Sequence, residues 1–224
     1  MKNKFTILGC GSSLGSPWIT NYWGNCNKNN KKNYRTRCCA HFQYKNISTL
    51  IDTSPDLKIQ FRDNKIKDVD AVMYTHEHMD QTSGIFELRP FFWKNKKKIE
   101  VYGSKKTIME LKKKFDFCFV KKQGYAPILK DNIIKNNFII KKGDNQVVNA
   151  GEAAHKQCMS EMGILFEQSK EFKIAFAREA MSGFEKFGKD ALAAAEFMLV
   201  ASHDGTKVAI HSVHDDLYCE KIIF

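Results

Sequence analysis

Residues 70–81 have the sequence DAVMYTHEHMDQ, in which a run of mostly apolar residues ends directly in two histidines and an aspartate at alternate positions. The first six residues predict a buried strand. Where the chain leaves the edge of a sheet, His76 and His78 can face one point and Asp80 can curl back beside them. Imidazole nitrogen and carboxylate oxygen are ligands of Zn²⁺ in proteins. The pattern therefore predicts a metal site at the end of a strand, with a pair of surface histidines in a polar loop as the alternative.

The rest of the chain predicts many short strands and a few helices, with a long surface loop over residues 18–37. Strands are expected at residues 5–8, 40–44, 48–53, 99–102, 139–140, 147–148, 163–166, 173–176, 197–201 and 207–210, and helices at 54–61, 105–115 and 184–196. This mixture indicates an α/β layered domain rather than a helix bundle. A length of 224 residues favours a single domain over residues 1–224, with less support for residues 150–224.

Composition excludes several classes of protein. An apolar share of 43% is enough for a hydrophobic core, and no run reaches the ~18 apolar residues of a membrane span. The amino terminus shows no secretion signal, and seven irregularly spaced cysteines do not indicate a disulfide framework. These features predict a soluble, cytoplasmic protein without a membrane partner.

The positive charge of the chain is unevenly distributed. Residues 1–149 carry 28 Lys or Arg against 13 Asp or Glu, whereas residues 150–224 carry eight against 12. Lysine scattered over a whole segment is more often a bias of composition than a binding surface. A positive face would still attract phosphate-bearing substrates.

The sequence resembles the metallo-β-lactamase fold, whose signature after a strand is H-x-H-x-D-H. Within that fold it is most similar to the branch of the phosphoribosyl 1,2-cyclic phosphate phosphodiesterases. The matching stretches are Leu8–Ser13, Gly15–Pro17, Trp23–Cys26, Arg35–Cys38, Ile51–Leu57, Thr75–Asp80, Glu87–Pro90 and Val101–Gly103. The resemblance implies a four-layer αββα sandwich with metal ions at the sheet edges, here shortened at its C-terminal end.

The resemblance also implies a set of site residues and one or two ions of Zn²⁺ or Mn²⁺. His76 and His78 would ligate the first ion and Asp80 the second. The full set of implied metal ligands is His76, His78, Asp80, Gln81, His155, Glu179 and His211. The implied catalytic groups are Asp80, which would orient or deprotonate the attacking water, and His214, which would donate a proton to the leaving oxygen.

Two of these positions depart from the family pattern. Gln81 stands where the family has a histidine of the second metal, and an amide oxygen is a poorer Zn²⁺ ligand than imidazole. Glu179 stands where an aspartate is expected, and its side chain is one methylene longer. The first metal's ligands could therefore survive while the second site is weakened.

Three functions remain open at this point. The first is a metal-dependent phosphodiesterase that acts on a small cyclic phosphate or nucleotide. The second is a nuclease of the tRNA 3′-processing type, supported by the basic charge and by aromatic residues at 18, 22 and 23 that could stack on bases. The third is a catalytically degenerate protein of the same fold that only binds a ligand. A small phosphate ester is the expected partner, nucleic acid is not favoured, and a homodimer is left open.

Three residues outside the motif carry weaker expectations. Asp52, at a strand end, is expected to hydrogen-bond the metal-site loop rather than to react. His41, in the middle of a strand, is expected to be a core or edge histidine with its hydrogen bonds satisfied. For Arg89, a contact with substrate and a structural ion pair are both open.

Overall fold

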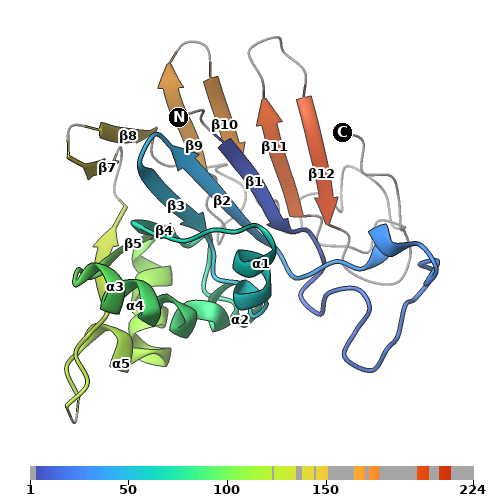
Figure 1. Ribbon diagram of the computed structural model, residues 1–224, viewed down its shortest axis with the longest axis horizontal. Helices are drawn as coiled ribbons and strands as arrows, with labels where there is room; N and C mark the ends of the chain where they lie inside the picture. Colours follow the sequence, from blue (N-terminus) through green and yellow to red (C-terminus); the bar gives the residue numbers. More distant parts are fainter. Residues whose placement is uncertain are drawn as a thin grey trace.

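The computed structural model describes residues 4–122, 124–134, 138–143 and 145–150, followed by the strands at 164–169, 172–176, 196–201 and 207–212. Within these residues the chain forms two six-stranded sheets, and its helices lie between residues 31 and 119 (Figure 1). The metal motif belongs to the first sheet.

The first sheet has strands in sequence order and changes from antiparallel to parallel pairing at its third strand. β1, β2 and β3 pair antiparallel, and β3, β4, β5 and β6 pair parallel. The strands are β1 (Lys4–Gly9), β2 (Cys39–Tyr44), β3 (Ile47–Ile51), β4 (Ala71–Met73), β5 (Ile99–Gly103) and β6 (Leu129–Ile133). Because β3 and β4 are parallel, their carboxyl ends lie at one edge, which places Asp52 beside the start of the metal motif.

The second sheet is an antiparallel meander with the order β12-β11-β10-β9-β8-β7. Its strands are β7 (Phe138–Lys142), β8 (Asn145–Ala150), β9 (Ile164–Ser169), β10 (Phe172–Phe176), β11 (Glu196–Ala201) and β12 (Lys207–Ser212). β3 contacts β7 and β8, and Lys142 of β7 forms an ion pair with Asp70 at 2.8 Å. These contacts join the two sheets.

The helices gather beside the first sheet, as Figure 1 shows. They are α1 (Leu57–Asp63), α2 (Met79–Thr82), α3 (Arg89–Asn95), α4 (Lys105–Lys114) and α5 (Asp116–Phe119), with 3-10 helices η1 (Lys31–Asn33) and η2 (Ser83–Leu88). Leu50 of β3 packs in one core with Leu57 of α1 and Leu111 of α4. Ile51 points to the opposite face of β3 and is also fully buried, so this strand is covered on both faces. No helix among the described residues is long and apolar enough to cross a membrane.

The observed architecture confirms the α/β class and the sandwich of sheets with a helical layer. Of the helix expected at 184–196, residues 184–195 lie outside the described residues, and Glu196 is the first residue of β11. Most expected strands agree with the observed ones to within two residues. Cys10, Cys38, Cys39 and Cys118 are not part of a disulfide, whereas Cys26 is disulfide-bonded.

His41 is a buried histidine of β2, as expected, and it makes stability depend on pH. Its Nε2 lies 2.8 Å from Ser48 Oγ, and the Ser48 hydroxyl donates to the Asp68 carbonyl oxygen at 2.5 Å. His41 therefore donates through Nε2–H to the hydroxyl oxygen. Burial, with a smaller contribution from the charge of Lys4, lowers the pKa of His41 to about 4.

The lowered pKa of His41 predicts the direction in which stability changes with pH. Between pH 6.5 and 4 the unfolded chain binds a proton at His41 that the folded protein does not bind, so stability falls as the pH falls. The free energy of unfolding should drop by up to about 3 kcal/mol from this group. A His41→Gln protein keeps an N–H donor but cannot be protonated. Urea unfolding at pH 7 and at pH 4.5 should show a smaller acid loss for the variant, and an equal loss in both proteins would contradict the assignment.

Candidate metal centre

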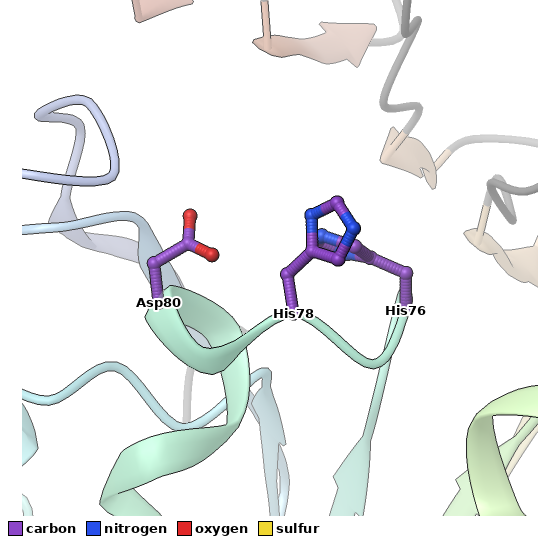
Figure 2. A group of neighbouring side chains, drawn as sticks. All are labelled: His76, His78 and Asp80. Carbon is purple, nitrogen blue, oxygen red and sulfur yellow. The ribbon is translucent and has the colours of Figure 1, made fainter. Parts of the chain in front are cut away.

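His76, His78 and Asp80 lie together at the end of β4. One ligand atom from each of the three side chains lies within 4.8 Å of the others. The two imidazole rings have centroids 4.5 Å apart and are inclined at 73°. Figure 2 shows that all three side chains project to the same side of the loop before α2. His76 is buried, Asp80 is half-buried and His78 is exposed, so the group opens to solvent on one side.

The backbone of the motif is fixed by hydrogen bonds at both ends. On the strand side, the Asp52 N–H donates to the Met73 carbonyl at 2.8 Å. On the helix side, the His78 carbonyl accepts from the Gln81 N–H at 3.1 Å and from Thr82 Oγ1 at 2.9 Å. His78 is the N-cap residue of α2, and its side chain makes no capping bond there. The imidazole of His78 is thus not required for the helix to begin.

A hydrogen-bond relay fixes the tautomer of His76. The Asp52 carboxylate accepts from the Thr75 N–H at 2.8 Å and from the Thr75 hydroxyl at 2.7 Å. Thr75 Oγ1 also lies 2.9 Å from His76 Nδ1. Because the hydroxyl proton is donated to Asp52, Nδ1 must carry the proton shared with Thr75. The lone pair of the His76 ring is therefore on Nε2, which is the form that can bind a metal ion.

Glu77, the residue between the histidines, is held by two lysines of α4. Its carboxylate pairs with Lys106 of α4 at 2.6 Å, and Lys114 Nζ donates to its carbonyl at 2.9 Å. Burial alone would raise the pKa of Glu77, but the hydrogen bond from Lys106 holds it below its usual value. These bonds tie the metal motif to α4.

Gln81 is buried at the start of α2 and contacts the carboxylate of the motif. Its Nε2 donates to Asp80 Oδ2 at 3.1 Å. The carbonyl of Gln81 accepts from the Thr53 N–H at 2.7 Å. The side chain thus orients Asp80, and its assignment as a ligand of a second ion stays a prediction.

A second ion pair, between Arg37 and Asp56, lies near Asp80. The Arg37 guanidinium donates to both carboxylate oxygens of Asp56, at 2.9 and 2.6 Å. The hydrogen bond to Asp56 raises the pKa of Arg37, and the negative charge of Asp80 adds to this effect. Arg37 therefore keeps a permanent positive charge close to the metal motif.

The donor set fits a divalent transition-metal ion. Two imidazole nitrogens and a carboxylate oxygen, with one side open to solvent, are typical of a catalytic zinc site and also suit Mn²⁺. The relay behind His76 is the support that metal-binding histidines usually have.

The other expected ligands belong to the C-terminal part of the chain. His155, Glu179 and His214 lie outside the described residues. His211 lies in β12, in register with Phe197 of β11. Their roles stay predictions.

Sequence reasoning assigned no role to Thr75 and did not anticipate the two lysines that hold Glu77. A hydroxyl residue directly before His76, next to a strand that ends in Asp52, was the available signal for the relay. The lysines come from α4, about 30 to 40 residues further along the chain, and no local pattern marks them.

Comparison with known proteins agrees with this geometry. A family model described as the beta-lactamase superfamily domain matches residues 48–178, which is more than half of the chain. The octanoyltransferase of Porphyromonas gingivalis (strain ATCC BAA-308 / W83) is 31% identical over 129 residues, which are 55% of this chain and 25% of that protein. This chain thus spans about a quarter of the length of that curated relative.

Two solved structures share the fold. A diphosphatase from the PhnP family is 25% identical with a TM-score of 0.58, covering 74% of this chain and 62% of its own. The short form of human tRNase Z is 14% identical with a TM-score of 0.52, covering 80% of this chain and 70% of its own. The family match, the paired sheets and the histidine–aspartate group at the end of β4 agree with one another, and the chain belongs to the beta-lactamase superfamily domain family.

Proposed function

We propose that the protein is a metal-dependent hydrolase, and specifically a phosphodiesterase that cleaves a small cyclic phosphate or nucleotide. The observation that carries the proposal is the convergence of His76, His78 and Asp80, with the His76 tautomer fixed by Thr75 and Asp52. Similarity to a protein described as a diphosphatase supports phosphorus as the reacting centre.

Each residue of the proposed site has its own role in the reaction. His76, through Nε2, and His78 would hold Zn²⁺ or Mn²⁺. A bound ion of this kind lowers the pKa of a water molecule toward neutrality and polarises a phosphoryl oxygen. Asp80, with Oδ2 held by Gln81, would orient the attacking water and accept its proton. His214 remains the proposed proton donor to the leaving oxygen.

The proposal is tested with the purified protein in its metal-loaded and chelator-treated forms. We expect the loaded protein to hydrolyse bis-(p-nitrophenyl) phosphate and a 2′,3′-cyclic nucleotide, and the treated protein to regain activity when Zn²⁺ or Mn²⁺ is added. Cleavage of a tRNA precursor without cleavage of the small esters would instead support the nuclease. A metal-loaded protein that is inactive on all three substrates would support the degenerate binding protein.

A further inference from the structure

On the helical side of the molecule, three exposed aromatic side chains contact one arginine, and a fourth contacts one of these three. The Arg89 guanidinium carbon lies 4.3 Å from the ring centroid of Trp93, 5.3 Å from Tyr125 and 5.5 Å from Phe86. Phe117 extends the group, with its ring 6.1 Å from that of Phe86 in an edge-to-face arrangement. We call these five residues the Arg89 cluster. Arg89 thus contacts aromatic rings. This differs from both alternatives that the sequence left open for it, a contact with substrate and a structural ion pair.

The rings of the Arg89 cluster face solvent although they are held in place. Phe117 is 42% exposed and Tyr125 is 59% exposed, and the other two rings lie between these values. They come from η2, α3, α5 and the turn after α5, which these ring contacts bring together. Exposed apolar side chains scattered singly need no explanation, but a contiguous group indicates a binding surface. Contact with Arg89 restricts Phe86, Trp93 and Tyr125 before any partner binds, and contact with Phe86 restricts Phe117. This lowers the entropy cost of binding.

The surroundings of the Arg89 cluster are strongly basic. Residues 86–125 contain 12 Lys or Arg against four Asp or Glu, a net charge of +8. Lysines flank the cluster directly in the sequence and are exposed: Lys94, Lys96, Lys97, Lys98, Lys121 and Lys122. Of these, Lys122 is paired with Asp116 and Lys94 lies 3.9 Å from Asp68, so the surface keeps a net positive charge.

We propose that the Arg89 cluster and its flanking lysines bind single-stranded RNA. Unpaired bases stack on exposed aromatic rings and on arginine guanidinium planes, while lysines neutralise the phosphates between them. A protein partner fits less well, because lysine is depleted at the cores of protein interfaces. A duplex also fits less well, because its bases are already stacked and cannot reach the rings.

The surface shares no residue with the metal motif, and the end of α4 connects the two. Lys114, at the end of α4, donates to the Glu77 carbonyl between the two histidines, and Phe117 follows three residues later. The binding proposal does not rest on the proposed hydrolysis.

The test measures binding of a fluorescein-labelled, unstructured 12-nucleotide RNA by anisotropy, with EDTA present so that the metal site has no part in the result. We expect saturable binding that weakens with added NaCl. Trp93→Ala and Tyr125→Ala should each raise Kd about tenfold, because each removes one stacking platform. Both side chains are exposed, and circular dichroism melting curves will show that the variants fold.

A matched control uses an aromatic residue outside the cluster. Tyr34→Ala removes a tyrosine that is 68% exposed and precedes the first sheet's second strand, and its Kd should stay within about twofold of the unmodified protein. The proposal is overturned if both cluster variants bind as tightly as the control. It is also overturned if the same RNA binds equally well as a duplex. A third contrary result would be that polyglutamate displaces the labelled RNA as effectively as unlabelled RNA does at an equal concentration of negative charge, since simple attraction of polyanions would then suffice.

Discussion

A His78→Ala protein should lose its bound metal and at least about a thousandfold of its hydrolytic rate, because one of the ion's ligands is removed. The expected loss is specific to the site. His78 is exposed and its side chain does not cap α2, so the substitution should leave the free energy of unfolding nearly unchanged. Metal content by plasma mass spectrometry and the rate on bis-(p-nitrophenyl) phosphate are measured on the same preparation.

The control for this variant is a substitution of the next residue in the motif. Met79→Ala removes a side chain that is 51% exposed and carries no nitrogen or oxygen ligand. It should bind metal like the unmodified protein. If His78→Ala retained a full equivalent of metal, the imidazole of His78 would not be a ligand and the assignment of the site would be wrong.

An Asp52→Asn protein should bind the metal about 10- to 100-fold more weakly although no ligand is altered, as is typical when a group that supports a metal ligand is changed. Asparagine has nearly the same shape and tolerates the left-handed backbone of this position, where φ is 60°. Its amide would donate to Thr75 Oγ1, where the carboxylate now accepts. The Thr75 proton could then be donated to His76 Nδ1, which would move the ring proton to Nε2 and block metal binding.

Histidine ¹⁵N chemical shifts of the metal-free protein report the tautomer directly. In the unmodified protein His76 should be protonated at Nδ1, and in Asp52→Asn a substantial fraction should be protonated at Nε2. Thr75→Ser keeps the hydroxyl and should retain metal, whereas Thr75→Val removes it and should resemble Asp52→Asn. Equal metal affinity in the serine and valine variants would show that the relay does not support His76.

The local pattern was enough to predict the strands that carry the site. Alternating and continuous apolar runs predicted β1 to β5, and β2 to β5 are buried on at least one face. It was not enough for α2, α5 and η2, which are too short for a helical period to show. β6, with the sequence LKDNI, carries polar side chains because it is the edge strand of its sheet, and it was missed.

The part of the candidate site that is local in the sequence was predictable from residue types and their spacing. His76, His78 and Asp80 are close in the sequence, so their convergence follows from the strand end that precedes them. The Asp52 relay depends on β3 and β4 lying side by side, which is a tertiary feature. The Arg89 cluster likewise joins residues from 86 to 125 and has no sequence motif.

The central claim is that His76 and His78, with Asp80 beside them, hold a divalent metal ion at the end of β4. Crystals of the protein purified with its native metal, or grown with added Zn²⁺, can be measured on both sides of the zinc absorption edge. We expect an anomalous peak about 2.0–2.2 Å from His76 Nε2 and from a nitrogen of the His78 ring. A map with no peak at that position, with the two rings turned apart into solvent, would contradict the account.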